Sequence, residues 1–129
     1  MRLTFDLAKT FVHLGQDGST IPLEVTETFW QDLSSGKLGG RGRLVSLFRF
    51  DAPWDSWEIH PNGDEIVCLI SGSAEMTLEH AGGKTETASL EQPGSFVLVP
   101  RGTWHTARPR VPTTMLFVTD GEGTQHRPA

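Results

Sequence analysis

Hydrophobic and polar residues alternate along much of the chain from residue 41 onward. In residues 43–50, leucine, serine and two phenylalanines occupy the even-numbered positions, and arginine begins and ends the odd-numbered ones. Residues 74–79 alternate in the same way. This period of two predicts strands with one buried face. Residues 65–70 are apolar at every position after Glu65, which is typical of a strand covered on both faces.

Turn-forming residues divide the rest of this region into further short segments. The chain of 129 residues contains 14 glycines and 8 prolines, more than an average globular domain. The strands predicted in this way are residues 43–50, 57–60, 65–70, 74–79, 85–90, 96–99, 104–108 and 115–119. Short strands that follow one another without helices predict an all-β sandwich or barrel.

The two ends of the chain lack this alternation. We expect residues 1–40 to form an irregular N-terminal arm that packs across the outside of the barrel, with one short helix. Thr26 is the expected N-cap of that helix, and Gly36 its end. Residues 41–120 are then the barrel, and residues 121–129 a polar C-terminal tail that is loose or bound to a partner subunit.

Composition excludes several classes of protein. The net charge is −5, with 11 basic and 16 acidic residues, so a nucleic-acid partner is not expected. No apolar run approaches the roughly 20 residues of a membrane span. The first residues lack the long apolar stretch of a secretory signal, which leaves the cytoplasm as the expected location. The single cysteine, Cys68, can form neither an intrachain disulfide nor a thiolate metal cluster alone.

Four residues with metal-binding chemistry occur beside tight turns. Glu58 and His60 are two positions apart on one predicted strand, so they share a face. Glu65 begins the next strand after a turn, and His105 follows another turn. If the sheet closes into a barrel, these side chains can converge at one end of its interior. Two imidazoles and two carboxylates suit a divalent ion such as Fe, Mn, Ni or Zn.

The spacing of these residues resembles the two motifs of the cupin superfamily. In the first motif, His60 is followed by Glu65 after four intervening residues and by Gly72 after six more. In the second motif, the segment 94–105 places glycine, proline, glycine and His105 at the expected intervals. The resemblance is to a small single-domain cupin of bacterial type. It implies a double-stranded β-helix, or jelly-roll, barrel with a small-molecule ligand inside.

Glu58 is where the sequence departs most from the cupin pattern. Cupins of the oxalate decarboxylase and germin type bind metal with three histidines and one glutamate, whereas this chain has Glu-x-His in place of His-x-His. Glu58 has three candidate roles: a metal ligand, a catalytic base beside a site formed by the other residues, or a partner of an inward-facing Arg49. The ligand role is slightly favoured, because a bare carboxylate inside a barrel is costly without a cation.

Two classes of function fit these residues. The first is a metal-dependent enzyme acting on a small carboxylate or carbonyl compound, of dioxygenase, decarboxylase or isomerase/lyase type. The second is a non-catalytic small-molecule-binding module, with or without a structural metal. In both cases the apolar outward positions of residues 66–70 leave surface that must be covered, and a homodimer is the usual solution among cupins.

The remaining aromatic, histidine and cysteine residues are assigned to packing or to the surface. Phe48, Val67, Leu69, Met76, Phe96, Leu98 and Phe117 are the predicted core or pocket wall. Trp54, Trp57 and Trp104 are expected near the barrel mouth or on outer faces, where packing is favoured over substrate stacking. His13, His80 and His126 are expected on the surface, and Cys68 on the outer face of its strand.

Overall fold

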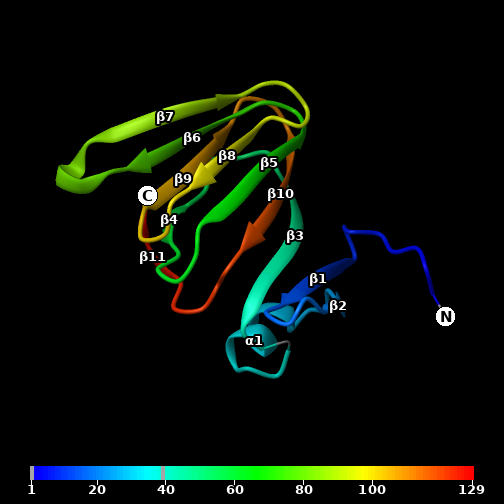
Figure 1. Cartoon of the computed structure of the whole chain (residues 1–129). Helices are drawn as coiled ribbons and strands as arrows, with labels where there is room; N and C mark the ends of the chain where they lie inside the picture. The colour runs from blue at the N-terminus through cyan, green and yellow to red at the C-terminus, as the bar shows by residue number, and fades with distance from the viewer. Residues whose placement is uncertain (1, 39) are drawn as a thin grey trace.

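The computed structural model describes residues 2–38 and 40–129, and it shows two antiparallel sheets that face each other (Figure 1). The strands are β1 Thr10–Gly15, β2 Thr20–Glu24, β3 Gly42–Phe50, β4 Ser56–Ile59, β5 Glu65–Ser71, β6 Ala74–Glu79, β7 Thr85–Leu90, β8 Phe96–Val99, β9 Trp104–Pro109, β10 Thr113–Thr119 and β11 Gln125–Pro128. One sheet has the order β2-β1-β3-β10-β5-β8, and the other has the order β11-β4-β9-β6-β7. The predicted all-β jelly-roll barrel is confirmed.

The core lies between the two sheets, and it includes the predicted core residues Val67, Leu69, Met76 and Phe117. Val67, Leu69, Met76 and Met115 are completely buried there. The whole cluster contains Val67, Leu69, Met76, Leu78, Leu90, Val99, Ala107, Met115 and Phe117. Burying one such side chain contributes about 1.5–3 kcal/mol, so this layer is what holds the two sheets face to face.

The N-terminal arm is more regular than its sequence suggests. β1 and β2 form a hairpin that extends the six-stranded sheet beyond β3, and α1, Phe29–Ser34, packs beside it. The helix has Thr28 rather than Thr26 as its N-cap, so the predicted start was wrong. The ring of Phe29 is buried and meets the ring of Phe11 edge-on at 5.3 Å. This tertiary contact, rather than the capping residue, fixes where the helix begins.

The C-terminal tail was expected to be loose or bound to a partner subunit, but its second half pairs within the chain. β11 pairs with β4 along four residues and becomes an edge of the five-stranded sheet. No helix within the described ranges is both long and apolar enough to cross a membrane.

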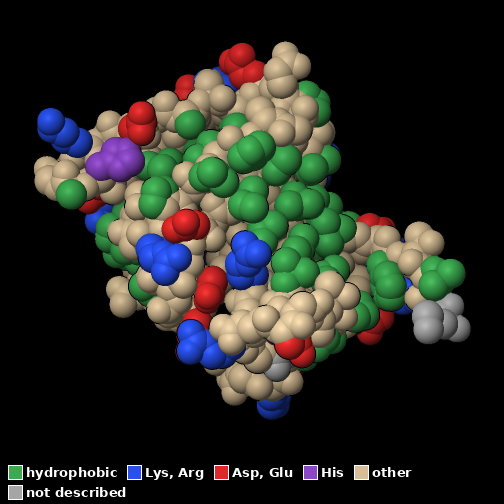
Figure 2. All heavy atoms as spheres, in the orientation of Figure 1, with side chains coloured by type: hydrophobic (Ala, Val, Ile, Leu, Met, Phe, Trp, Pro, Cys, Tyr) green, Lys and Arg blue, Asp and Glu red, His purple; other side chains and the backbone are tan. Residues whose placement is uncertain are grey.

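Phe96 and Leu98 lie on the outside of the barrel instead of in the core. They are 58% and 60% exposed on β8, the edge strand of the six-stranded sheet. Figure 2 shows apolar side chains gathered on this side of the molecule. A strand of four apolar residues carries no alternation of polarity, so its sequence cannot tell the inner face from the outer one. Val97 and Val99 are the residues of β8 that pack on the core.

Candidate metal centre

Two tight turns hold the ends of β4 and β9 together. The backbone N–H of Gly102, in the turn before β9, donates a hydrogen bond of 2.9 Å to the carbonyl oxygen of His60. The backbone N–H of Arg101 donates another of 2.9 Å to a carboxylate oxygen of Asp64. Within the sheet, Glu58 on β4 is the register partner of His105 on β9. The local turns therefore bring the two sequence motifs to one end of the barrel.

All four predicted site residues meet at this end. Glu58, His60 and His105 come from the five-stranded sheet side, and Glu65 reaches them from the first position of β5 in the opposite sheet. His60 Nε2 lies 3.5 Å from Glu58 Oε2 and 3.3 Å from Glu65 Oε2. His105 Nε2 lies 3.0 Å from Glu65 Oε1. The site is thus a junction between the two sheets.

The distances between these atoms fit ligands of one metal ion. Two ligand atoms about 2.1 Å from an ion, at about 90–110° from each other, are separated by roughly 3.0–3.4 Å. One ligand atom from each of Glu58, His60 and His105 lies within 4.8 Å of the others. Among the described residues, His60 Nε2, His105 Nε2 and Glu65 Oε1 are buried and have no hydrogen-bond partner outside this cluster. Buried polar atoms left in this state need a further partner, and a divalent cation would supply it.

Hydrogen bonds on the far side of each ring turn the Nε2 atoms toward the centre. His105 Nδ1–H donates to the carbonyl oxygen of Thr103 at 3.0 Å, so in the neutral ring Nε2 carries the lone pair. His60 Nδ1 lies 2.8 Å from the hydroxyl oxygen of Thr124, which can accept its N–H in the same way. Metal-binding histidines are held by such outer contacts. The arrangement therefore has the histidine geometry that a metal site requires.

The charges of the cluster are strongly coupled. Burial disfavours the charged form of His60, but the close carboxylates of Glu58 and Glu65 outweigh it and raise the pKa of His60 to about 9. Burial likewise disfavours charged Glu65, but the contacts with His105 and His60 prevail and lower the pKa of Glu65 to about 2. Thr119 also donates a hydrogen bond of 2.5 Å to Glu65. Glu65 is therefore a buried carboxylate in its ionised form.

Glu58 marks the open side of the site. His105, Glu65 and His60 are 0%, 3% and 5% exposed, whereas the side chain of Glu58 is 29% exposed. On the inner side, the ring of Trp54 approaches His105 edge-on at 6.3 Å. A small molecule that reaches the centre from solvent would therefore meet Glu58 first.

Arg49 does not enter the site, because it is exposed on β3. The predicted alternative of an inward-facing partner for Glu58 was wrong. The Arg127 guanidinium lies over the rings of both Trp57 and Trp104, with its carbon 5.0 and 4.6 Å from their centroids. These two rings are therefore used in packing.

The predicted surface position is confirmed for His126 and is wrong for His13. His126 is 57% exposed, but it is the register partner of Glu58, and its Nε2 lies 3.9 Å from Glu58 Oε1. His13 is buried, with Nε2 3.1 Å from the carbonyl oxygen of Gly40. Thr124 was not singled out at all. Only the pairing of β11 with β4 reveals Thr124 and His126, because neither stands at a motif spacing.

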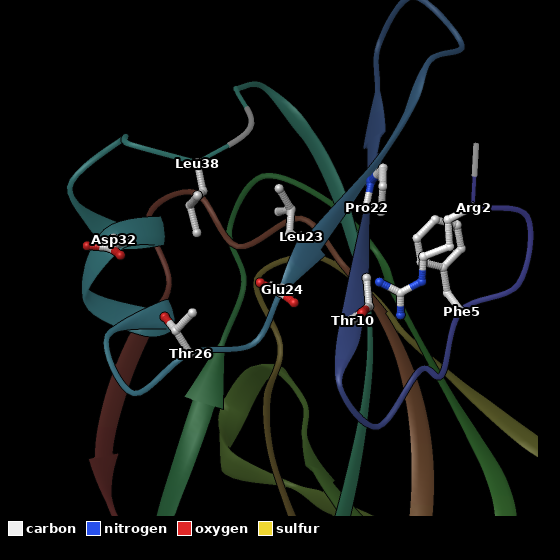
Figure 3. A pocket seen from close by; sticks show the side chains of 9 residues that line it. All are labelled: Arg2, Phe5, Thr10, Pro22, Leu23, Glu24, Thr26, Asp32 and Leu38. Carbon is white, nitrogen blue, oxygen red and sulfur yellow. The ribbon is translucent and has the colours of Figure 1, made fainter.

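Two hollows open elsewhere on the surface. One, of about 480 Å³, lies within the N-terminal arm, between its first residues, β2 and α1 (Figure 3). The residues that line it include Arg2, Leu23 and Asp32. The other, of about 460 Å³, lies over the turns that carry the site and is lined by residues that include Asp64 and Arg101. None of the four candidate ligands lines either hollow.

Comparisons with known proteins identify relatives by structure only. No protein-family model matches the chain, and no curated protein matches it. Among solved structures, Bacillus subtilis oxalate decarboxylase is 21% identical, with a TM-score of 0.55 over 69% of this chain and 24% of that chain. An oxalate oxidase is 18% identical, with a TM-score of 0.54 over 64% and 44% of the respective chains. A cupin superfamily protein from Desulfitobacterium hafniense is 24% identical, with a TM-score of 0.51 over 64% and 69%.

These similarities show a shared fold. The matches span 24% and 44% of the two oxalate enzymes, so each enzyme is considerably larger than the part that this chain resembles. Both sequence motifs of this chain lie in the barrel. This agrees with a structural similarity that is limited to the barrel.

Proposed function

Because the chain has the fold of the cupins, we propose that it binds one divalent metal ion of the group Fe, Mn, Ni and Zn through Glu58, His60, Glu65 and His105. The observation that carries this proposal is the meeting of two buried Nε2 atoms, each within 3.3 Å of a carboxylate oxygen of the buried Glu65, with no hydrogen-bond partner outside the cluster among the described residues. Two carboxylates and two neutral imidazoles carry a charge of −2, which a divalent ion would neutralise.

We further propose that the centre acts on a small carboxylate or carbonyl compound, in a reaction of dioxygenase, decarboxylase or isomerase/lyase type. A bound divalent ion would supply Lewis-acid polarisation of a carboxylate or carbonyl oxygen. Support comes from two structural neighbours, an oxalate decarboxylase with Mn(II) centres and an oxalate oxidase. Their substrate is a small dicarboxylate by name, and this chain shares only their fold.

Glu58 decides between two versions of this mechanism. Its Oε2 atom lies 3.5 Å from His60 Nε2, close enough for Glu58 to complete the ligand set. Its partial exposure also places a carboxylate where an incoming molecule would meet it, and there it could accept a proton from that molecule. We favour the ligand role, because one of its oxygen atoms lies within the same 4.8 Å group as the two histidine nitrogens.

The nearly closed site gives the second candidate function its support. Three of the four side chains are at most 5% exposed, which leaves a substrate little access except past Glu58. A metal held there could tie the two sheets together in a non-catalytic small-molecule-binding module. This alternative predicts tight metal binding and thermal stabilisation without turnover.

Substitution of Glu58 tests these alternatives. If Glu58 is a ligand, Glu58→Gln weakens metal binding at least tenfold in calorimetric titrations, because an amide is a poorer donor than a carboxylate. Glu58→His then retains binding of Ni or Zn, which imidazole suits. If Glu58 is a base, Glu58→Gln keeps the metal and lowers turnover of a responsive small carboxylate by about 10²–10⁴-fold.

Glu86→Gln is the matched control, because Glu86 forms a Glu–His pair of 3.0 Å with the exposed His80, away from the centre. Wild-type protein that binds none of the four metals contradicts the proposed function in both versions. Metal binding with no turnover on a panel of small carboxylates and carbonyl compounds favours the binding module.

A further inference from the structure

The C-terminal segment reaches the candidate metal centre from far along the chain. Thr124 lies 64 positions after His60, yet its hydroxyl oxygen is 2.8 Å from His60 Nδ1. When Nδ1–H donates to this hydroxyl, Nε2 of the same ring faces Glu65 Oε2 at 3.3 Å. Thr124 thus holds the ring in the orientation in which it can bind a metal.

β11 continues this contact along the edge of the site. It pairs with β4 from Gln125 to Pro128, and this pairing sets His126 opposite Glu58. His126 Nε2 lies 3.9 Å from Glu58 Oε1, while Glu58 Oε2 faces His60. The segment therefore flanks two of the four candidate ligands, His60 and Glu58.

Arg127 anchors this strand on the opposite face of the sheet. Its guanidinium lies over the rings of Trp57 and Trp104, with distances of 5.0 and 4.6 Å to their centroids. It also forms an ion pair with Glu79 of β6. One side chain of β11 thus contacts three other strands of the sheet, and cation–π contacts of this kind are favourable even at partly exposed sites.

We propose that residues 124–127 position the metal centre: Thr124 orients His60, His126 contacts Glu58, and Arg127 holds β11, which carries His126 and directly follows Thr124. This inference rests on the proposed metal-binding function. Thr124 and Arg127 are positioning residues, since neither needs to touch the metal. Because positioning and binding are linked, metal binding must in turn stabilise the docked strand.

The test compares substitutions at Thr124 and Arg127 with matched controls. Thr124→Val keeps the shape of the side chain and removes the hydroxyl, whereas Thr124→Ser keeps the hydroxyl. The control is Thr77→Val, because Thr77 is paired with Thr87 at 3.2 Å elsewhere in the sheet. Arg127→Gln is compared with Arg110→Gln, because Arg110 forms an ion pair with Glu75 at 2.7 Å, also away from the centre.

Calorimetric titration with Mn(II) measures the metal affinity of each full-length variant. We expect Thr124→Val and Arg127→Gln to weaken binding by about 10–100-fold, the usual effect of removing an outer contact of a metal ligand. Thr124→Ser and both controls should bind close to wild type. The role of the Thr124 hydroxyl is overturned if Thr124→Val binds Mn(II) as tightly as wild type, or if Thr124→Val and Thr124→Ser lose affinity equally. The role of Arg127 in holding β11 is overturned if Arg127→Gln binds Mn(II) as tightly as wild type.

Measurements on the metal-free protein separate this inference from the proposed function. Wild-type protein that binds no metal contradicts the function. In that case the NMR resonances of the His60 ring nitrogens still test the orientation, and hydrogen exchange of the β11 amides still tests the role of Arg127. We expect Thr124→Val to shift the Nδ1 resonance and Thr124→Ser to preserve it, and Arg127→Gln to speed exchange in β11. An unchanged resonance in Thr124→Val, or unchanged exchange in Arg127→Gln, overturns the inference whatever the metal result.

Discussion

His60 and Glu65 give the metal-free protein a pH dependence with a defined sign. The pKa of Glu65 is lowered from 4.5 to about 2, so its contribution is present above pH 4.5 and is lost as the pH falls toward 2. The pKa of His60 is raised from 6.5 to about 9, so its contribution is present below pH 6.5 and is lost as the pH rises through 9. Their combined contribution to the free energy of unfolding is therefore largest between pH 4.5 and 6.5.

We therefore predict that the free energy of unfolding of metal-free protein falls by up to about 3 kcal/mol between pH 6 and pH 9.5. Urea unfolding in the presence of a chelator measures this decline. His60→Gln should reduce it, because glutamine does not titrate. A wild-type free energy that is constant or rises over this range is inconsistent with the assignment, as is an equally steep decline in His60→Gln.

Residue spacing predicted the candidate ligands but not the residues that hold them. His60, Glu65 and His105 stand at fixed distances from turns along the chain, and those turns fold locally. The contact of Thr124 with His60 depends on strand pairing between segments 64 positions apart. No local period or turn signal encodes such a contact, so the sequence could not reveal it.

At the scale of the elements, the strands between residues 42 and 119 were foreseeable, some from alternation with one buried face and others, such as β5 and β8, from short apolar runs between turn residues. β11 was not, because it has no apolar alternation and is attached by its pairing with β4 and by the contacts of the Arg127 guanidinium with two tryptophan rings. The hairpin of β1 and β2 was missed for a related reason. Its glycines and Pro22 indicate an irregular chain, but the pairing of β1 with β2 and β3 makes this segment a regular hairpin.

Gly72 makes the connection between β5 and β6 dependent on the absence of a side chain. Its φ angle is +92°, and an added Cβ would lie 2.6 Å from the carbonyl oxygen of Pro112. Gly82 has a similar φ of +84°, but a Cβ there meets no described atom within 4 Å. The two glycines thus differ in crowding rather than in backbone angle.

We predict that Gly72→Ala destabilises the protein by about 2–4 kcal/mol, since it combines left-handed strain with a clash against backbone. Gly82→Ala should cost about 1–2 kcal/mol, from strain alone. Chemical denaturation of both variants measures the difference. Equal losses in the free energy of unfolding of the two variants would contradict an added cost from crowding around a Cβ at position 72.

At the scale of the whole molecule, the outer face of the six-stranded sheet has the character of an interface. Register pairs align two apolar rows across β8, β5, β10 and β3. The rows are Leu98, Ile66, Val118 and Val45, and Phe96, Cys68, Leu116 and Leu47. Contiguous apolar surface of this kind marks contact sites, and the homodimer expected from the sequence stays a prediction with this face as its site.

We predict that light scattering of the wild-type protein at micromolar concentration gives twice the chain mass of 14.2 kDa. Phe96→Lys combined with Leu98→Lys should give the monomer mass, because two charges would be buried without partners. Val111→Lys is the control, since Val111 is 49% exposed on the loop before β10. Wild-type protein that is monomeric throughout, or a double variant that remains dimeric, contradicts this interface.

We propose above that the junction of the two sheets is a metal site. Elemental analysis tests this proposal most directly. Untagged protein is purified without added metal, and its content of Fe, Mn, Ni and Zn is measured alongside that of Glu65→Gln, which lacks the buried negative charge. We predict about one ion per chain in the wild type and a large loss in the variant. Wild-type protein without any of these metals, and unable to take one up when each is supplied, would contradict it.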